Sequence, residues 1–337
     1  MPSPLNWGIL GAARIATSQV IPALQHGARH GILAIASRDA ARAAAAAKAL
    51  AIPRSYGSYE ALLADPEVEA IYNPLPNHLH VPWSIKSMEA GKHVLCEKPI
   101  AMNAAEARTL LDARQRTGRH VCEAFMVRSH PQWIRARELL TAGRIGTLSL
   151  ITGHFSYNRR DPNDVRSRVD FGGGVLLDIG CYPITLARWL FDAEPLRASS
   201  FIDRDPDMGI DRVTSGIVEF SGGRQLAFTC AGQMVLHQVM QLYGSKGRIQ
   251  LEIPFNAPHD RAVKMFVDDG RDLVGGGIET IEFPAVNQFR LQADRFADAV
   301  QGKGEVPVRL EDSIANMEVI DALFRSAESG RAEQVGG

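Results

Sequence analysis

Short apolar runs alternate with helical patterns over the first 125 residues, and this alternation constrains the fold more than any other feature. The apolar runs lie at residues 7–10, 32–37, 70–72, 93–96 and 120–124. Strands that alternate with helices at this spacing form βαβ units, and such units build a parallel, doubly wound sheet. The sequence therefore predicts an N-terminal α/β domain over residues 1–125.

The pattern changes near residue 125. One more helix is expected at 133–142, and extended segments follow at 147–157, 198–203, 214–220, 225–231, 239–243, 248–252 and 263–267. Consecutive strands joined by tight turns form an antiparallel or mixed sheet. Helices are expected at 288–300 and 310–328, and the residues after Gly330 are expected to form a frayed tail. We predict a second, α+β domain over residues 126–337, with a large, mostly antiparallel open sheet.

Composition narrows the class of protein. The 337 residues carry 37 Lys and Arg against 38 Asp and Glu, so there is no basic excess of the kind that nucleic-acid binding requires. Asp178 and Arg188 interrupt the longest apolar stretch, and the N-terminus lacks the features of a signal peptide. We therefore expect a cytoplasmic protein with no membrane partner. The four cysteines are scattered, which predicts reduced thiols and neither disulfides nor a metal site.

The first apolar run leads into Gly8-Ile-Leu-Gly11-Ala-Ala13-Arg-Ile-Ala16, a G-x-G-x-x-G/A fingerprint in which Ala13 replaces the second glycine. Gly11 supplies the tight turn, and Ala16 permits close packing of helix on strand. A predicted strand precedes the motif and a predicted helix follows it, which is the context of a Rossmann dinucleotide site. The predicted cofactor-binding residues here are Gly11, Ala12, Ala13, Arg14 and Ile15.

The end of the second predicted strand selects the cofactor. NAD enzymes usually place Asp or Glu there to accept from the ribose 2′-hydroxyl, whereas this chain has Ser37-Arg38. A hydroxyl and a guanidinium suit a 2′-phosphate. Asp39 is one place late and is better interpreted as a helix N-cap. The sequence therefore predicts NADP in preference to NAD.

Three further polar segments follow predicted strands or open a predicted helix. In Asn73-Pro-Leu-Pro-Asn77-His78-Leu-His80, polar groups on a loop stiffened by proline are candidates to line a nicotinamide pocket, although capping or surface roles remain open. In Cys96-Glu97-Lys98-Pro99, two charges end a buried strand, which favours a site because isolated charges are costly to bury. The candidate cofactor contacts in these two segments are Leu75, Pro76, Asn77, His80, Glu97 and Lys98.

The third segment is Gly172-Gly-Gly174-Val-Leu-Leu-Asp178-Ile-Gly-Cys-Tyr182-Pro183. Asp178 and Tyr182 are four residues apart and share one face if the stretch is helical. Pro183 lacks an N–H group and frees a carbonyl near Ile179, so the helix is expected to be distorted there. A distorted helix with these two side chains beside a glycine-rich turn is typical of a site.

Together these segments resemble the Gfo/Idh/MocA oxidoreductases, and the resemblance covers nearly the whole chain. Its carriers are the Gly8 to Ala16 fingerprint, Asn73-Pro-Leu-Pro-Asn77, Glu97-Lys98-Pro99, Glu123-Ala-Phe-Met126 with His130-Pro131, and Gly172 to Tyr182. Tyr182 is similar to the branch with glucose–fructose oxidoreductase, NADP-dependent xylose dehydrogenase and dihydrodiol dehydrogenase. The resemblance implies that Lys98 and Tyr182 lie at the hydride-transfer centre with Asp178 close by. It also implies substrate binding by the C-terminal domain and a homodimer or homotetramer formed through its sheet.

The predicted activity is hydride transfer between NADP and a sugar or polyol carbon, with Tyr182 exchanging the hydroxyl proton. An ordinary tyrosine has a pKa near 10, and a Lys98 ammonium nearby favours the phenolate. Asp178 would orient the substrate or the lysine, and no metal is required. Asn163 and Arg166 are candidate sugar contacts, with a surface-loop role as their alternative.

Two other functions stay open at this stage. One is a reductase of the dihydrodiol or biliverdin type, and the other is a non-catalytic NADP-binding sensor. The sequence does not name the sugar, the reaction direction, or whether NADP is held tightly or exchanged, and it does not separate a dimer from a tetramer.

Overall fold

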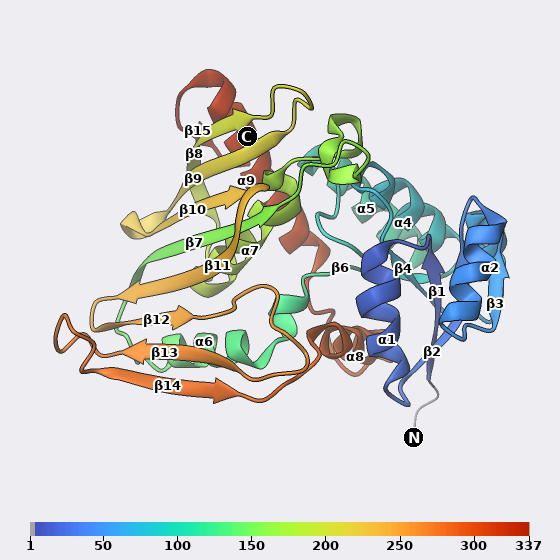
Figure 1. The fold of residues 1–337 in the computed structure, drawn as a ribbon, viewed down its shortest axis with the longest axis horizontal. Coiled ribbons are helices and arrows are strands. Elements are labelled where there is room, and N and C mark those ends of the chain that lie inside the picture. The colour runs from blue at the N-terminus through green and yellow to red at the C-terminus, as the bar shows by residue number, and fades with distance from the viewer. Residues whose placement is uncertain (1–3, 337) are drawn as a thin grey trace. The chain divides into compact units, whose positions relative to one another are not determined.

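The computed structural model describes residues 4–336, and the chain divides into two compact units (Figure 1). The first unit contains Met1–Met126 and Asn287–Ile314, and the second contains Val127–Val286 and Ala315–Gly337. Residues 287–314, which the sequence pattern groups with the C-terminal strands, thus pack with the N-terminal unit.

The first unit is built on a parallel sheet of six strands in the order β3-β2-β1-β4-β5-β6. This is the strand order of a doubly wound Rossmann sheet, so the predicted fold class is confirmed. The short edge strand β3 was not predicted, because three half-exposed residues carry almost no pattern. The strands are β1 (Leu5–Leu10), β2 (His30–Ala36), β3 (Arg54–Tyr56), β4 (Ala70–Asn73), β5 (His93–Cys96) and β6 (Val121–Glu123).

The helices of this unit begin where the sequence places polar caps. The side chains of Asp39, Ser58 and Asn103 each accept hydrogen bonds from backbone N–H groups of the first turn, which confirms the predicted N-cap at Asp39. These N–H groups have no partner inside the helix, so the caps stabilise it. The elements are the π-turn η1 (Ala16–Val20), α1 (Ile21–Gln25), α2 (Ala40–Ala49), α3 (Tyr59–Leu63), η2 (Asn77–Leu79), α4 (His80–Glu89), α5 (Ala104–Thr117) and α8 (Gln288–Val300).

Helix α8 joins this unit through buried contacts with β1 and β2. The rings of Trp7 and Phe296 lie 5.5 Å apart. Trp7 Nε1 donates to His30 Nδ1 over 3.2 Å, and His30 Nε2 lies 3.0 Å from Asp294 Oδ1. A donor on one ring nitrogen and a carboxylate on the other fix the orientation of the His30 ring. One imidazole thus connects the strands with a helix that lies more than 260 residues later in the chain.

The second unit is built on a sheet of nine strands in the order β14-β13-β12-β11-β7-β10-β9-β8-β15. Among the described residues β7 and β10 pair in parallel and the other neighbours are antiparallel, which confirms the predicted mostly antiparallel sheet. The strands are β7 (Leu148–Asn158), β8 (Pro195–Arg204), β9 (Asp211–Phe220), β10 (Gln225–Ala231), β11 (Gln233–Gly244), β12 (Gly247–Leu251), β13 (Val263–Asp268), β14 (Ile278–Phe283) and β15 (Glu333–Gln334).

Two strands of this sheet escaped prediction. β14 is largely exposed and rich in glutamate, so it lacks the apolar alternation that marks a strand. The frayed tail expected after Gly330 is wrong for β15, because Glu333 and Gln334 pair with Ala198 and Arg197 of β8. Backbone hydrogen bonds to an existing strand edge order this segment without needing an apolar side chain.

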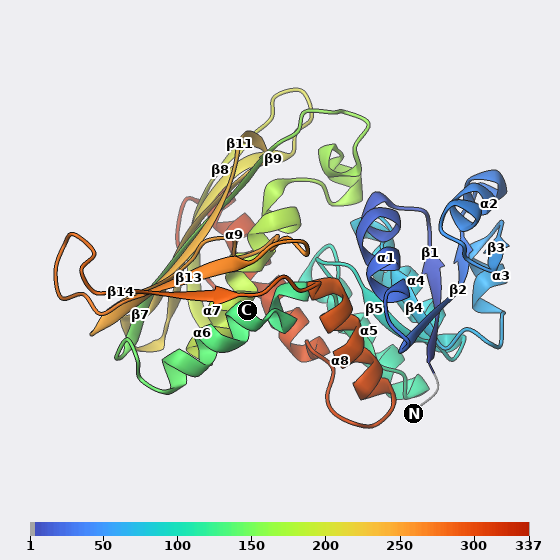
Figure 2. The same ribbon diagram turned by 60° about the horizontal axis from the view of Figure 1, so that its bottom comes forward.

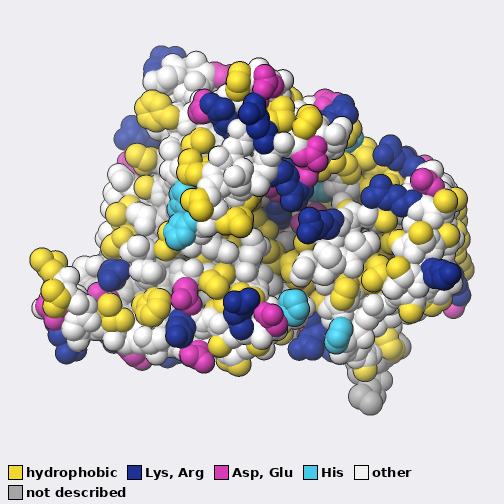
Figure 3. Space-filling model, in the orientation of Figure 1, with side chains coloured by type: hydrophobic (Ala, Val, Ile, Leu, Met, Phe, Trp, Pro, Cys, Tyr) yellow, Lys and Arg dark blue, Asp and Glu magenta, His cyan; other side chains and the backbone are white. Residues whose placement is uncertain are grey.

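Helices cover one face of this sheet (Figure 2). The unit contains η3 (Met126–Ser129), α6 (Pro131–Thr141), η4 (Val165–Ser167), η5 (Val169–Phe171), η6 (Leu176–Gly180), α7 (Cys181–Phe191), η7 (Ser221–Gly223) and α9 (Leu310–Ser329), whose first residues belong to the first unit. The backbone N–H of Ser200 in β8 donates to Ser326 Oγ of α9 over 3.0 Å, so α9 packs against this face of the sheet. The opposite face exposes apolar side chains such as Phe201 and Ile217, among charged and histidine side chains (Figure 3).

The stretch Val169–Phe191 is long and apolar enough to cross a membrane by length and composition alone. Its most apolar window is 89% buried inside the protein, and α7 has ten buried residues. A helix surrounded by its own domain in this way is a core helix, and its apolar character is explained by packing.

Candidate active site

The first loop of the N-terminal unit is shaped by Gly11. Its φ of +81° is a left-handed conformation that strongly favours glycine, and its N–H donates to the Ala36 carbonyl over 2.7 Å. A Cβ at this position would lie 3.1 Å from a methyl group of Leu75. The chain then becomes helical from Arg14 onward, with Thr17 N–H donating to the Ala13 carbonyl. The fingerprint therefore forms the tight strand-to-helix turn that a dinucleotide needs.

The end of β2 carries basic groups and no available carboxylate. Asp39 accepts from the N–H groups of Ala41 and Arg42, so its carboxylate is engaged as the N-cap of α2. The Arg42 guanidinium donates to the Ala12 carbonyl over 3.1 Å, which places it beside the first loop. Burial raises the pKa of Tyr59, and Arg38 and Arg42 oppose that rise, so both cations lie near its ring. Sequence reasoning missed Arg42, although it follows Arg38 by about one helical turn.

The loop after β4 is held by buried side chains. The Asn73 side chain donates to the His80 carbonyl over 3.0 Å and to Ser84 Oγ over 3.2 Å. The ring nitrogens of His80 lie 2.7 Å from the carbonyl oxygens of Leu75 and Pro99. Burial lowers the pKa of His80 to about 4, so the ring is neutral and donates from one nitrogen only. His80 thus lies between two loops that carry predicted cofactor contacts, and both of its nitrogens face backbone.

The turn after β5 depends on two glutamates. Tyr72 Oη donates to Glu97 Oε1 over 2.6 Å, and Glu97 Oε2 accepts from the N–H of Lys98. Glu123, which is 1% exposed at the end of β6, accepts from the Ile100 N–H over 2.8 Å. The peptide bond between Lys98 and Pro99 is cis. Lys98 therefore leaves the carboxyl end of β5 on a turn whose backbone is fixed on both sides.

In the second unit, the predicted helix distortion is confirmed. Residues 176–180 form a single π-helical turn immediately before α7, and Pro183 lies in the first turn of α7. π-turns inside helices are frequent at functional sites. Asp211 Oδ2 accepts from the Leu176 N–H over 2.7 Å and caps this turn from β9. Burial raises the pKa of Asp211 to about 6.

Gly174 makes that cap possible. It has a φ of +109°, and a Cβ there would lie 1.7 Å from Asp211 Oδ1. Tyr182 is 4% exposed, and its ring contacts those of Phe155 and Phe255 at centroid distances of 6.0 and 5.6 Å. The glycine-rich turn thus sets the start of the helix that carries Tyr182, and the rings of Phe155 and Phe255 pack against Tyr182.

Asp178 is the centre of a polar network. Its Oδ2 accepts from Tyr157 Oη and from Arg166 Nε, each over 2.9 Å. The Arg166 guanidinium also lies 3.4 Å from Asp164, which pairs with Arg159 as well. Arg166 is therefore engaged with two carboxylates. Tyr157 was not a predicted site residue, because a tyrosine in a β-strand pattern gives no sign of its partner 21 residues away.

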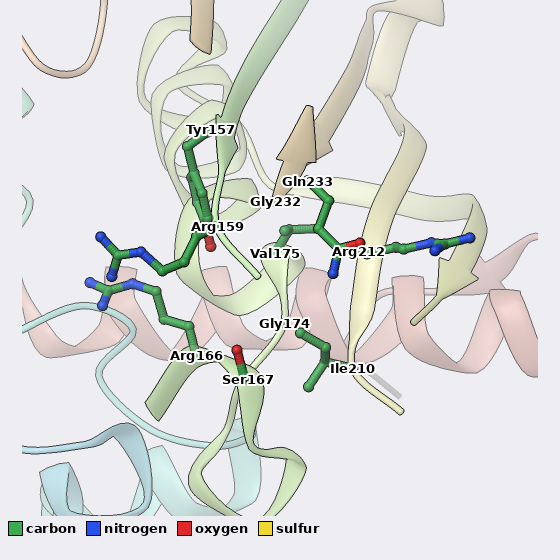
Figure 4. A pocket seen from close by; sticks show the side chains of 10 residues that line it. All are labelled: Tyr157, Arg159, Arg166, Ser167, Gly174, Val175, Ile210, Arg212, Gly232 and Gln233. Carbon is green, nitrogen blue, oxygen red and sulfur yellow. The ribbon is translucent and has the colours of Figure 1, made fainter. Parts of the chain in front are cut away.

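A pocket beside this network belongs to the second unit (Figure 4). Arg159 and Arg166 point to the same side of it, and Arg212 points the opposite way. Asn163 is exposed in a turn that its backbone N–H closes onto Asp161. The pocket is lined by Tyr157, Arg159, Arg166, Ser167, Gly174, Val175, Ile210, Arg212, Gly232 and Gln233.

The structure thus gathers the predicted residues into two groups. Gly11, Ser37, Leu75 and Lys98 all follow the carboxyl ends of strands in the first unit, where open parallel sheets bind ligands. Asp178, Tyr182 and Arg166 belong to the second unit. Within residues 4–336 there is no group of three or more His, Cys, Asp or Glu side chains placed to hold a metal ion.

The parallel sheet with a glycine turn after β1 and basic groups after β2 defines a dinucleotide-binding Rossmann domain. A model of the oxidoreductase family with an NAD-binding Rossmann fold matches residues 5–125, and a model of the GFO/IDH/MocA C-terminal domain matches residues 133–250. The chain belongs to the Gfo/Idh/MocA oxidoreductase family, as its motifs predict. The predicted NAD(P)-dependent oxidoreductase class is therefore confirmed.

Relatives cover nearly the whole chain. An uncharacterized oxidoreductase of Rhizobium meliloti is 44% identical over 98% of this chain and 99% of its own. The NADP(+)-dependent D-xylose 1-dehydrogenase 2 of Haloferax volcanii is 38% identical over 98% of this chain and 100% of its own. Among solved structures, a 3-ketoreductase from Actinomadura kijaniata in complex with NADP and TDP-benzene has a TM-score of 0.89 at 28% identity, and the match covers 96% of this chain and 98% of that chain.

Proposed function

We propose that the protein is an NADP-dependent oxidoreductase that transfers a hydride between nicotinamide and a sugar or polyol carbon. In this proposal Lys98 and Tyr182 are the acid and base pair, with Asp178 beside them. The carrying observation is that Asp178 and Tyr182 lie four residues apart on one buried helical segment, in a family member that also has Lys98 at the end of β5. The relative named as a D-xylose dehydrogenase supports a sugar substrate.

The residues present fit NADP in preference to NAD. Gly11 forms the tight turn that opens a dinucleotide loop, and Ala13 adds one methyl group at the position where a second glycine usually lets the backbone approach the pyrophosphate. The only acidic side chain next to the end of β2 is Asp39, which is engaged as a helix cap. Arg38 and Arg42 then remain to meet a 2′-phosphate, and a guanidinium binds phosphate with paired hydrogen bonds. Relatives whose descriptions include NADP support the same choice.

NADP supplies the hydride acceptor or donor at its nicotinamide ring. Tyr182 takes the proton from the substrate hydroxyl during oxidation and returns it during reduction. A tyrosine with an ordinary pKa near 10 is a weak base at neutral pH, and in this proposal the Lys98 ammonium stabilises its phenolate. Asp178 orients the substrate hydroxyl or the lysine. No step in this scheme requires a metal ion.

The charges of the second unit favour an uncharged substrate. Arg159 pairs with Asp164, Arg166 with Asp178 and Arg212 with Asp203. An anionic substrate such as a sugar phosphate or a nucleotide sugar would have to compete with a carboxylate for each of these guanidinium groups. A neutral aldose or polyol needs only hydrogen bonds, which ion-paired arginines still donate.

A dihydrodiol or biliverdin-type substrate is the second candidate, and the aromatic cluster around Tyr182 is the observation that favours it. Phe255 is 0% exposed and Phe155 is 7% exposed, however, so these rings pack in the core and offer little surface to a planar substrate. A non-catalytic NADP sensor is the third candidate. A sensor would have no use for Lys98, Asp178 and Tyr182 together.

A single experiment separates these candidates. The purified protein is mixed with NADP and a panel of aldoses and polyols, and the absorbance of reduced nicotinamide is followed. Growth of that absorbance with one sugar supports the proposal, and a response only to an aromatic dihydrodiol supports the second candidate. Tight NADP binding with no change of redox state for any compound supports the sensor. Dissociation constants measured for NADP and NAD test the cofactor, and tighter NAD binding would contradict the assignment.

We also propose that the enzyme is a cytoplasmic homodimer or homotetramer that associates through the open face of the nine-stranded sheet. Phe201 is 85% exposed on this face and Ile217 is 52% exposed, and exposed apolar side chains on neighbouring strands are typical of an interface. The four free cysteines are buried, which suits a reducing compartment. Sedimentation of the wild type and of Phe201→Asp tests the assembly. A monomeric wild type would contradict it.

A further inference from the structure

Side chains from two segments of the second unit donate to a single oxygen atom of Asp178, which lies on a third segment. Tyr157 comes from the end of β7, Arg166 from the 3-10 turn η4, and Asp178 from the π-turn before α7. Tyr157 Oη and Arg166 Nε each donate to Asp178 Oδ2 over 2.9 Å. Hydrogen bonds with a charged partner are about twice as strong as neutral ones, and two of them on one atom fix its position.

The backbone around Arg166 is fixed independently of this contact. Gly174 N–H donates to the Arg166 carbonyl over 2.9 Å, and Gly173 N–H donates to the Arg168 carbonyl over 2.8 Å. A Cβ at Gly173 would lie 2.4 Å from the Arg166 carbonyl oxygen, so the close approach of these two loop segments requires glycine. The backbone that carries Arg166 is therefore fixed without Asp178, and Asp164 contacts the guanidinium as a second carboxylate.

The protonation states of the two donors do not change over the working range of the enzyme. Burial, and then the Asp178 carboxylate, raise the pKa of Tyr157, so its hydroxyl remains protonated and donates. The Asp178 carboxylate raises the pKa of Arg166, which remains a cation. Hydrogen bonds to the charged form of a carboxyl group favour that form. Tyr157 is thus a permanent donor and is unsuited to act as the base itself.

Other titratable groups also face Asp178. Asp164 lies on the far side of Arg166, and its own pKa is lowered by Arg166 and Arg159 despite the opposing effect of burial. Cys230 of β10 is a neutral thiol, because burial raises its pKa, and Cys181 Sγ donates to the Asp178 carbonyl. Asp211 lies at the start of the same π-turn and is protonated only near pH 6 and below. Of the groups named here, Tyr157 and Arg166 are the two that donate to Oδ2 of the Asp178 carboxylate.

We infer that Tyr157 and Arg166 are positioning residues that keep Asp178 ionised and aimed in one direction beside Tyr182. The inference rests on the proposed function, because Asp178 acts there on the substrate or the lysine. Arg166 consequently serves the reaction through Asp178, in addition to any hydrogen bond that its remaining N–H groups make to a sugar. Tyr157 gains a role for which neither its sequence position nor its strand gives a reason.

The test uses the substitution Tyr157→Phe in the full chain, with the sugar that the panel identifies and its oxidised product. Reduction of that product is the informative direction, because Tyr182 must then be protonated and Asp178 is the group expected to set the acid limb of the pH profile. Loss of one donor should raise that limb by about one pH unit and lower kcat by about tenfold, with NADP affinity unchanged. Tyr243→Phe is the matched control, since Tyr243 is a half-buried tyrosine of β11 that donates to Gln241.

Two further variants keep the test decisive. Arg166→Lys retains the positive charge and loses the Nε donor, so it should shift the acid limb in the same direction by less. In an Asp178→Asn background, Tyr157→Phe should have no additional effect on kcat, because its partner is gone. An acid limb and kcat for Tyr157→Phe that match those of Tyr243→Phe would overturn the inference. If the aldose panel gives no reduced nicotinamide at all, the proposed function fails first, so the two failures are distinguishable.

Discussion

The two units of the protein position their candidate functional residues in different ways. In the first unit the turns that carry the candidate residues are fixed by groups close to them in sequence: Gly11 forms the turn after β1, Asp39 caps the helix after β2, and the side chains of Asn73 and Glu97 fix the turns after β4 and β5. In the second unit the contacts join residues far apart in sequence, with Asp178 and Asp211 as the acceptors. A site fixed by neighbouring residues is readable as a motif, whereas a site fixed by distant residues is not.

The largest expected effect is that of Tyr182→Phe, which should lower turnover through the second unit and leave NADP binding by the first unit unchanged. Tyr182→Phe removes the proton donor and acceptor and should lower turnover by roughly 10²- to 10⁴-fold. NADP affinity should be nearly unchanged, because the predicted cofactor contacts belong to the first unit. Steady-state kinetics together with NADP titration measure both quantities. Normal turnover in this variant would refute the role of Tyr182.

The next prediction concerns the second unit and its Gly174. Gly174→Ala should destabilise the protein by about 3–5 kcal/mol, because the new methyl group would overlap the Asp211 carboxylate and the φ of +109° disfavours alanine. Gly222→Ala is the control, since Gly222 also has a positive φ of +73° but open space around it. That control should cost roughly 1–2 kcal/mol. Urea unfolding measures both, and equal losses would show that the Asp211 contact is unimportant.

Asp211 predicts that the free energy of unfolding depends on pH through the second unit. Its folded pKa is raised to about 6, so the folded state binds the proton more tightly than the unfolded chain does. The wild type should therefore lose stability from this group as the pH rises from about 4 to about 6, by about 3 kcal/mol. Asp211→Asn retains an acceptor oxygen and lacks this titration. Unfolding free energies measured across that range should diverge for the two proteins, and parallel curves would contradict the assignment.

The smallest expected effect concerns the first unit and its Arg42. Arg42→Ala removes one guanidinium beside the first loop and should weaken NADP binding by about tenfold, which corresponds to the loss of one charged hydrogen bond. NAD affinity should not change, because NAD lacks the 2′-phosphate. Arg116→Ala is a suitable control, because Arg116 lies on the surface of the same unit and pairs with Glu89. Equal losses for the two cofactors would assign Arg42 to the loop and not to the phosphate.

Much of the fold and part of the site followed from local sequence. The alternation of strands and helices, the cap at Asp39 and the distortion before Pro183 all depend on residues within a few positions of one another. Their physical causes are backbone hydrogen-bonding and steric requirements that act over one or two turns. For that reason the sequence alone determined the parallel α/β class of the first domain, the glycine turn at Gly11 and the placement of Asp178 and Tyr182 on one helical segment.

The tertiary structure decided everything that depends on partners far apart in the chain. Arg42 meets the Ala12 carbonyl across 30 residues, Tyr157 meets Asp178 across 21, and Asp211 meets the Leu176 N–H across 35. The sequence pattern also grouped α8 with the later strands, whereas His30 connects it to β1 and β2. Such contacts follow from sheet register and helix packing, which no local spacing encodes. Arg166 shows the consequence: its sequence position suggests a sugar contact, and only the folded chain reveals the carboxylates that hold it.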